Sequence, residues 1–353
     1  MATAVDLSGG LDDAVEYGLV EHPRLADMRE GVSVWVYDDQ GRFGFPRVCL
    51  EAMGPDFDPK RLQVNLAFAD GRVLIGDPRG AAGPSLDAEG KAVIFTGGPL
   101  EFRLLGPWQG WSVVYDGLMT DTTTAATIER RTGEAERIPV RFELEVTNAA
   151  PPWVQGRMSR EADEQLAKTD SIFVGGQKTA FENGLRYEQL VRAKGTVRIG
   201  DEEWDFTGPG SRIHRQGFRN LTGFEGHVWQ SALFPSGRGF GQMWLLPNNY
   251  KEGYIFDGTR LLPANVVEVS WLRKLYPSGA GEDVSLVLET ELGRHEIQAE
   301  TVYSRYIPAG DEFETEGFWP IHWQQAGVRY VWDGEEAYGM LERSSKPELV
   351  TSG

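Results

Sequence analysis

Hydrophobic and polar residues alternate along much of the chain. The segment 32–37 alternates Val with Ser, Trp and Tyr, and the segment 141–146 alternates Arg and Glu with Phe, Leu and Val. Side chains of a β-strand point to opposite faces at every second residue, so this period buries one face and leaves the other in solvent. Turns such as Asp70-Gly71 and Asp333-Gly334 separate the alternating segments. The pattern predicts antiparallel hairpins.

Strand-like segments recur through both halves of the chain, at the spacing of about 8–12 residues that is typical of all-β proteins. Further examples are 62–68, 72–75, 186–191, 195–199, 203–206, 227–234, 239–246, 254–256, 266–271, 284–289, 296–303, 328–332 and 337–342. Persuasive helical composition is confined to one stretch, 159–168. The sequence therefore predicts an all-β fold, with two packed antiparallel β barrels or sandwiches and little helix.

The character of the chain changes near its middle. The segment 148–152 holds two alanines and two prolines, the polar stretch 159–168 follows, and Gly175-Gly176 comes next. A domain typically holds roughly 100–200 residues, so two domains fit in this chain. We predict an N-terminal β domain over residues 1–160 and a C-terminal β domain over residues 161–353.

The charge of the chain narrows the range of partners. Lys and Arg number 35 against 53 Asp and Glu, which gives a formal net charge of −18 at pH 7. Nucleic acids and anionic membranes both attract basic patches, so neither is an expected partner. No run of about 18 apolar residues occurs, so we also expect no membrane-spanning helix.

The single cysteine, Cys49, bears on the cellular compartment. One thiol forms neither a disulfide within the chain nor a Cys-rich zinc site, and it is compatible with a reducing cytoplasm. The first eight residues lack the basic and apolar regions of a signal peptide. We therefore expect a cytoplasmic protein, and exposed sheet edges would support a homodimer.

One concentrated polar stretch lies between Arg212 and Arg219. It holds three arginines and His214 within eight residues. The Gly-Pro-Gly-Ser segment 208–211 predicts a break after the strand at 203–206, so we place the stretch in a loop, where sites on β scaffolds are common. The imidazole of His214 titrates near neutrality and is able to give or take a proton. The alternative is a solvated loop whose arginines pair with carboxylates.

Glu188 is a candidate partner for this histidine. It follows Tyr187 on a predicted strand, so it faces inward if Tyr187 faces outward. A buried carboxylate needs a partner, and Arg212 or Arg219 would serve. In the functional interpretation Glu188 orients His214. In the structural interpretation it belongs to a buried ion pair.

Two further histidines lie in settings that suit a binding site. His227 opens the strand that follows the polar stretch, and it would share a barrel mouth with His214 if the two strands were neighbours. His322 lies between Trp319 and Trp323, a composition that suits an apolar pocket wall with one polar group. The alternatives are a histidine at a strand edge and a packed core cluster.

Several motifs with known chemistry are absent from the sequence. There is no Gly-x-Ser-x-Gly elbow for a nucleophilic serine, no P-loop and no dinucleotide-binding fingerprint that opens a helix. The five histidines are scattered, with no His-x-His or His-Glu-x-x-His pattern. We predict that the protein uses no metal and no cofactor.

Several short motifs point to a known family. They are Gly-Leu-Arg-Tyr-Glu-Gln at 184–189, Gly-Thr-Val at 195–197, the segment 208–219, Trp-Gln-Ser-Ala at 229–232, Pro-Ser-Gly at 235–237 and Ala-Tyr-Gly-Met-Leu-Glu at 337–342. Together they resemble the lipocalin-like proteins related to carotenoid 1,2-hydratase and AttH, most specifically over residues 184–245. In many relatives the central segment reads Arg-Asp-His-Ser-Trp-Gly-x-Arg.

The central segment matches this pattern in part. The matching residues are Arg212, His214, Gly217 and Arg219, and the departures are Ile213, Arg215 and Gln216. The resemblance implies two packed lipocalin-like β barrels with a hydrophobic cleft. It also implies kinship with hydratases of isoprenoid double bonds, dehydratases and cyclases, none of which needs a redox cofactor. The Asp of the motif is Ile213 here, so Glu188 would have to replace it.

We predict a cofactor-independent acid/base enzyme of the hydratase, dehydratase, isomerase or cyclase type. It would act on an apolar, cyclic or isoprenoid-like small molecule in a cleft at the domain interface. His214 would move the proton, assisted by Arg212 and Glu188. The side chains expected to contact the substrate are Arg219, Tyr187, His227, Trp229, Trp244, Trp319, His322 and Trp323. The alternatives are a non-catalytic lipocalin-like carrier of a hydrophobic ligand and an interaction module with a filled core.

Overall fold

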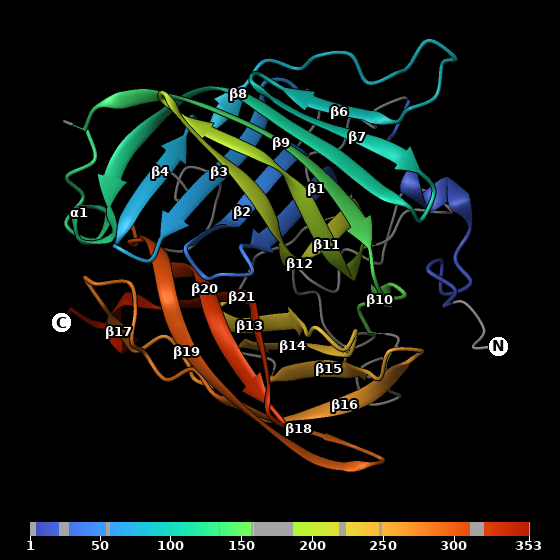
Figure 1. The fold of residues 1–353 in the computed structure, drawn as a ribbon, viewed down its shortest axis with the longest axis vertical. Coiled ribbons are helices and arrows are strands. Elements are labelled where there is room, and N and C mark those ends of the chain that lie inside the picture. The colour runs from blue at the N-terminus through green and yellow to red at the C-terminus, as the bar shows by residue number, and fades with distance from the viewer. Residues whose placement is uncertain are drawn as a thin grey trace.

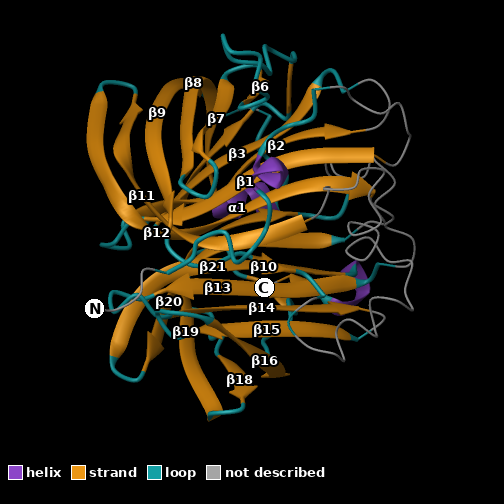
Figure 2. Ribbon diagram, turned by 90° about the vertical axis from the view of Figure 1, so that its right-hand side faces the viewer, coloured by secondary structure: helices purple, strands orange, loops and turns teal. Residues whose placement is uncertain are grey.

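The computed structural model describes residues 5–20, 28–53, 57–133, 135–156, 158, 186–218, 224–246, 249–310 and 321–352. Most of these residues lie in strands, which form two closed barrels, one above the other (Figures 1 and 2). The predicted all-β class, with two antiparallel barrels and little helix, is confirmed. No helix among the described segments is both long enough and apolar enough to cross a bilayer.

Eight antiparallel strands close the first barrel. In order around it they are β1 (Met28–Tyr37), β2 (Phe43–Met53), β3 (Lys60–Phe68), β4 (Arg72–Gly76), β8 (Gly110–Thr123), β9 (Arg137–Asn148), β11 (Arg186–Ile199) and β12 (Glu202–Phe218). β9 closes the ring because it pairs with β8 on one side and with β11 on the other. The shorter elements are β5 (Arg79–Gly80), β6 (Ile94–Gly97), β7 (Leu100–Gly106), β10 (Trp153–Val154), the 3-10 helix η1 (Asp13–Glu16) and the helix α1 (Thr124–Ile128).

The second barrel also has eight antiparallel strands. They are β13 (Gly226–Leu233), β14 (Gly239–Leu246), β15 (Tyr250–Phe256), β16 (Leu261–Glu268), β18 (Leu286–Thr290), β19 (Gly293–Ile307), β20 (His322–Trp332) and β21 (Glu335–Ser345). A parallel pair outside the barrel joins β17 (Lys274–Leu275) to β22 (Thr351–Ser352), which follows the 3-10 helix η3 (Pro347–Leu349).

The chain passes between the barrels later than the predicted boundary at residue 160. β11 and β12 lie beyond that residue, yet they pair with β9 and β1 and complete the first barrel. Without them, both β9 and β1 would present unpaired N–H and C=O groups along an edge. The passage therefore lies between β12 and β13, and the Arg-x-His-x-x-Gly-x-Arg segment begins in the first barrel.

Both barrel interiors are filled by apolar side chains. In the first barrel, the ring of Phe45 lies 4.8 Å from that of Phe142 and 5.4 Å from that of Phe206, measured between centroids. In the second barrel, Phe240 and Tyr330 meet edge to face at 5.2 Å. Side chains that interdigitate in this way leave little room for a ligand along the barrel axis.

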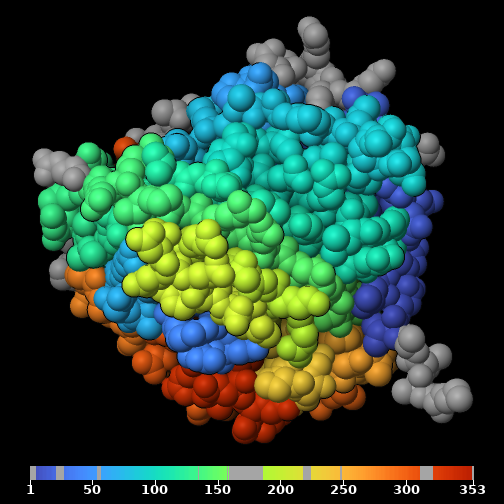
Figure 3. All heavy atoms as spheres, turned by 45° about the horizontal axis from the view of Figure 1, so that its top comes forward, coloured from blue at the N-terminus to red at the C-terminus, as the bar shows by residue number. Residues whose placement is uncertain are grey.

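The barrels are joined by a cluster that combines aromatic and ionic contacts. Trp35 of β1 meets Trp229 of β13 edge to face, with centroids 4.9 Å apart. Nη1 of Arg47 on β2 lies 2.7 Å from Oε2 of Glu342 on β21. In the space-filling view the second barrel, in orange and red, lies directly against the first (Figure 3). The relative position of the barrels is therefore fixed by buried contacts.

The Arg47–Glu342 pair provides a test of this interface. Arg47 holds the pKa of Glu342 at about 2 against the effect of burial, so Arg47→Met leaves a buried carboxylate short of its main cation. Removing one partner of a buried pair typically costs about 3–5 kcal/mol, and we expect a loss of this order in urea unfolding. Arg198→Met breaks an exposed pair with Glu203 and should change the stability little. Equal effects of the two variants would contradict the role of the buried pair.

Candidate functional site

The polar stretch predicted to form a loop is part of strand β12, which runs unbroken from Glu202 to Phe218. Gly208 and Gly210 allow this strand to approach β1 closely. A Cβ on Gly208 would lie 1.7 Å from the carbonyl oxygen of Tyr37, and one on Gly210 would lie 2.0 Å from that of Trp35. The loop prediction was wrong because these glycines permit close strand packing and do not form a turn.

Alternation along β12 sends its side chains to two different places. Arg212, His214 and Gln216 point into the first barrel, where Arg212 and His214 contact Trp111. Ile213 belongs to the apolar cluster between the barrels. From Gly208 onwards the strand is therefore buried or half-buried on both faces, and each polar side chain there needs a partner.

The partner of Arg212 comes from the distant helix η1. Glu16 is fully buried, and its Oε1 lies 2.8 Å from Nη2 of Arg212. The same oxygen accepts a hydrogen bond from the hydroxyl of Tyr187, and Oε2 accepts one from the backbone N–H of Trp108 at 3.2 Å. Gln189 accepts a further hydrogen bond from Nε of Arg212 at 3.0 Å. These contacts hold η1 against one end of the first barrel (Figure 1).

His214 lies in the same cluster. Its Nδ1 is 3.3 Å from the hydroxyl oxygen of Tyr187, and its ring meets Phe95 edge to face at 5.4 Å. Burial lowers the pKa of His214 to about 4; Glu16 opposes this shift and Arg212 adds to it. The imidazole is therefore neutral at pH 7.

Tyr187 and Glu16, which belong to the same cluster, differ in charge state: the phenol is neutral and the carboxyl group is ionised. Burial raises the pKa of Tyr187 well above 10, and the neighbouring carboxylate of Glu16 adds to the effect. Burial also opposes ionisation of Glu16, but Arg212 and Tyr187 outweigh it and lower the pKa of that carboxyl. The cluster therefore combines a carboxylate, a guanidinium, a neutral phenol and a neutral imidazole.

A pocket of about 160 Å³ lies against Phe95. Its lining residues are mostly apolar or small, with two acidic residues and one lysine, and they comprise Glu30, Leu50, Ala52, Phe57, Asp58, Lys60, Ala82, Gly83, Ser85, Ile94, Phe95 and Thr96. Phe95 separates the pocket from His214, because its ring contacts the imidazole and also forms part of the pocket wall. The pocket and the Glu16 cluster are therefore neighbours in the first barrel.

Glu30 is the buried carboxyl group of this pocket. Its Oε1 accepts hydrogen bonds from the backbone N–H of Leu19 at 2.7 Å and from Nε2 of Gln216 at 3.1 Å. Burial raises the pKa of Glu30 to about 7, although these hydrogen bonds and the charge of Lys60 act in the other direction. Glu30 is therefore present in both protonation states near neutral pH.

Glu188 does not contact His214. It lies opposite Ile213 in the β11–β12 pairing, on the face of the sheet turned towards the second barrel. Its Oε1 is 2.8 Å from Nη2 of Arg186, and its Oε2 accepts a hydrogen bond from Nε1 of Trp229 at 3.0 Å. The predicted contact with His214 was wrong because Tyr187, rather than Glu188, has the inward-facing position.

His227 and His214 do not share a barrel mouth, contrary to the prediction. His227 lies between the barrels, with Nδ1 2.7 Å from the hydroxyl of Ser344 and Nε2 3.5 Å from Glu342. Its ring meets that of Trp323 at 5.0 Å. The odd-numbered positions of β13 face the first barrel, whereas His214 faces that barrel's interior.

The remaining predicted contact residues are dispersed. Trp244 lies at the second barrel, where its Nε1 donates to Asn249 at 2.8 Å. His322 is half-buried and accepts a hydrogen bond from the backbone N–H of Ala309 at 3.3 Å. Arg219 and Trp319 lie outside the described residues. The predicted set therefore divides between the first barrel, the interface and the second barrel.

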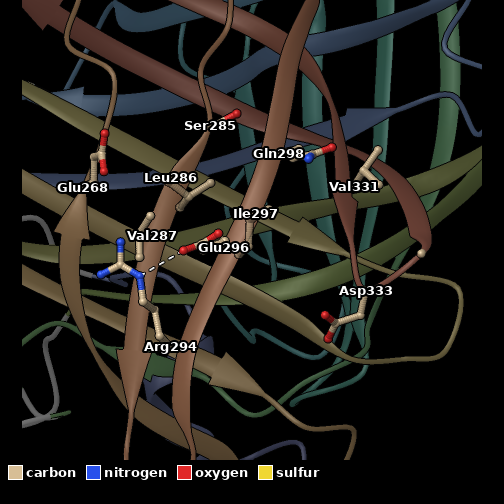
Figure 4. A pocket seen from close by; sticks show the side chains of 11 residues that line it. Glu268, Ser285, Leu286, Val287, Arg294, Glu296, Ile297, Gln298, Val331 and Asp333 are labelled. Atoms are coloured by element: carbon tan, nitrogen blue, oxygen red, sulfur yellow. Dashed lines mark hydrogen bonds and ion pairs between the residues drawn. The ribbon is translucent and has the colours of Figure 1, made fainter.

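The larger hollows elsewhere on the molecule contain none of the predicted site residues, and a small cavity between the barrels is lined by two of them, Trp229 and Trp323. One of about 540 Å³ lies over β18–β20 and is bordered by charged side chains such as Arg294, Glu296 and Asp333 (Figure 4). Another, of about 360 Å³, lies at the edge of the interface beside Arg130 and Arg305. A cavity of about 20 Å³ lies deeper between the barrels. The substrate cleft predicted at the domain interface stays a prediction.

The residues that sequence reasoning missed are Glu16, Glu30 and Lys60. Each lies in a segment that looks ordinary by itself, and its role depends on a partner far along the chain. Glu16 and Arg212 are 196 positions apart. No group of three or more His, Cys, Asp or Glu side chains that could hold a metal occurs in the part of the chain that the structure describes.

The family described as "Domain of unknown function (DUF7064)" matches residues 21–347. No curated protein gives a significant match. An AttH-like protein from Nitrosomonas europaea has a TM-score of 0.54 at 14% identity, over 93% of this chain and 97% of that one. At this identity the similarity shows the fold alone. It confirms the fold that the resemblance to AttH-related proteins implies.

Two further structures are more distant. CghA has a TM-score of 0.48 at 10% identity, over 96% of this chain and 97% of that one. Kievitone hydratase from Nectria haematococca has a TM-score of 0.42 at 9% identity, over 97% of each chain.

The raised pKa of Glu30 predicts a pH-dependent effect of Glu30→Gln on stability. The folded-state pKa of about 7 lies above the ordinary value of 4.5, so the folded state binds the extra proton between these pH values. Stability from this group is present below about pH 4.5 and is lost as the pH rises through 7. Glutamine stays neutral, so the variant should gain about 2–3 kcal/mol over the parent between pH 5 and pH 8 in urea unfolding. A difference that does not change with pH would contradict the assignment, and the exposed Glu203→Gln is the control.

Proposed function

The chain belongs to the DUF7064 family, and we propose that it is a cofactor-independent acid/base enzyme that acts on a small, largely apolar molecule in the first barrel. The reaction would be a hydration, dehydration, isomerisation or cyclisation. The observation that carries the proposal is Glu30, a buried carboxyl with a pKa of about 7 in the wall of an apolar pocket.

Glu30 has the properties of a proton carrier. A general acid or base works best when its pKa lies near the working pH, because both protonation states are then populated. The hydrogen bonds from Leu19 and Gln216 hold its carboxyl group in place. Apolar side chains such as Leu50, Ile94 and Phe95 form the wall beside Glu30, and a low local dielectric strengthens electrostatic interactions.

The pocket limits the size of what it binds. A water molecule has a share of about 30 Å³ in the liquid, so 160 Å³ corresponds to roughly five waters. This volume suits a short apolar fragment that carries an oxygen or a double bond. The charged group of Lys60, on the wall of the same pocket, is placed to attract such an oxygen.

We propose that His214 positions the wall of the pocket, and that Glu30 moves the proton. The cluster of Arg212, Tyr187 and His214 anchors Glu16 of η1. Three residues further on, Leu19 donates the hydrogen bond that holds Glu30. The contacts that hold η1 in place therefore also fix the position of the Glu30 carboxyl group, through the short segment from Glu16 to Leu19. The predicted catalytic role of His214 stays a prediction that the variants below test.

The filled barrel interiors argue against the alternative function, a non-catalytic carrier of a hydrophobic ligand. A lipocalin-like carrier would hold its ligand along the barrel axis, where Phe45, Phe142 and Phe206 are packed against one another. The pocket of about 160 Å³ is small for a large hydrophobic ligand. An acid/base site for a compact substrate agrees better with both observations.

Glu30→Gln tests the proton carrier. The protein is incubated with a panel of small apolar alcohols, enones and dienes, and products are followed by mass spectrometry. For the substrate so found, Glu30→Gln should lower kcat by about 10²–10⁴-fold, the usual contribution of positioned acid/base catalysis. Turnover by the parent should depend on a group that titrates near pH 7. Parental turnover by Glu30→Gln, with Glu203→Gln as the control, would refute the assignment.

His214→Gln tests the positioning role. The variant should loosen η1 and lower kcat/KM, while the pH profile keeps the titration near pH 7 that Glu30 contributes. Hydrogen exchange at the amide of Leu19 should become faster, because the anchor of η1 is weakened. A profile that loses this titration in His214→Gln and retains it in Glu30→Gln would make His214 the proton carrier.

A further inference from the structure

Lys60 is the basic residue of the pocket in the first barrel, and its setting is unusual for a lysine. The residue is only 8% exposed. Lysine is almost never buried to this extent unless it is paired. Among the described residues, the contact recorded for its Nζ is with the ring of Phe57, 5.2 Å from the centroid. No described carboxylate or carbonyl lies within hydrogen-bonding reach of this amine.

The surroundings of Lys60 make its ammonium form less stable than that of an exposed lysine. Burial lowers its pKa, and the charges of Glu30 and Asp58 only partly oppose this effect. The other walls of the pocket include Leu50, Ile94 and Phe95, which offer no hydrogen bond to an ammonium group. A larger fraction of free amine is therefore present near neutral pH than for an exposed lysine.

We propose that Lys60 is a nucleophile that forms an imine with a small aldehyde or ketone bound in this pocket. The inference rests on the proposed function, because it uses the same pocket and the same proton carrier, and it narrows the substrate to carbonyl compounds. Imine-forming lysines in proteins are typically activated by an apolar pocket in this way.

The step balances with the groups that the pocket provides. The lone pair of the neutral Lys60 Nζ attacks the carbonyl carbon, a C–N bond forms, and the C=O π electrons move to oxygen. Proton transfer from nitrogen to oxygen gives a neutral carbinolamine. The protonated carboxyl of Glu30 then donates a proton to the hydroxyl, which leaves as water while C=N forms. The products are a protonated imine, the Glu30 carboxylate and one water.

The experiment is reductive trapping of the full-length protein. Butanal or cyclohexanone is added at pH 7 with sodium cyanoborohydride, and each lysine is analysed by peptide mass spectrometry. Lys60 should be alkylated several-fold faster than the exposed Lys194, because its lowered pKa leaves a larger fraction of free amine at pH 7. Alkylation of Lys60 no faster than that of Lys194 would overturn the proposal.

Two variants separate this proposal from the proposed function. Lys60→Arg keeps the charge but forms no imine, so it should lose turnover of the carbonyl substrate. Parental turnover by this variant would overturn the nucleophilic role. Glu30→Gln should slow trapping at Lys60 without abolishing it. Trapping at Lys60 in a protein whose turnover does not depend on Glu30 would leave the imine standing and refute the proposed function.

One further outcome identifies a different role for the amine. If butyrate raises the Tm of the parent and of Lys60→Arg equally, and neither carbonyl compound is trapped at Lys60, the residue holds an anion by its charge. That result would overturn the covalent proposal and leave the acid/base role of Glu30 intact. A matched Lys194→Arg variant should behave as the parent in every arm, because Lys194 pairs with Glu145 at the surface.

Discussion

Burial on both faces of strand β1, and of β12 from Gly208 onwards, is the constraint on which the rest of the structure depends. Every residue of β1 is buried, because one face lines the first barrel and the other meets the second barrel. A polar side chain on such a strand has no access to water, so it needs a protein partner on whichever side it faces. Inside the barrel, Arg212 meets Glu16 from η1. Between the barrels, Arg47 on the neighbouring β2 meets Glu342. The stacking of the barrels thus determines where the buried charges lie.

Two buried glutamates of the first barrel show how local contacts set different charge states. Both suffer the cost of burial, which favours the protonated form. Glu16 lies against the guanidinium of Arg212, which keeps its pKa below the usual value. Glu30 is held by an amide and a backbone N–H and sees Lys60 only at longer range, so burial dominates and its pKa is about 7. One carboxyl is therefore a permanent anion that anchors η1, and the other is a group that titrates at physiological pH.

The features predicted correctly from the sequence are those that depend on local pattern. Alternation of period two and Gly-containing turns identify strands wherever they occur, and this was enough for the all-β class and the two barrels. The end of the first barrel was missed because strand pairing is not local: β11 and β12 join β9 and β1 across a long stretch of chain. Gly208 and Gly210 suggested a turn, but their role is close approach to β1. The carboxyl partner of Arg212 was sought in Glu188, nearby in sequence. It is Glu16, 196 residues away, and no periodicity in the chain connects the two.

Under the proposed function, the same contacts favour binding of a substrate in the first barrel over binding between the barrels. Opening the interface would separate Arg47 from Glu342 and expose the Trp35–Trp229 cluster. The cavity that lies deep between the barrels has a volume of only about 20 Å³. The pocket beside Glu30 already has about 160 Å³, and its carboxyl group is held by a short segment that follows η1. Displacement of η1 would break the buried Glu16–Arg212 pair and leave the contacts between the barrels in place. The anchor at Glu16 therefore fixes the short segment whose Leu19 holds the carboxyl group of Glu30.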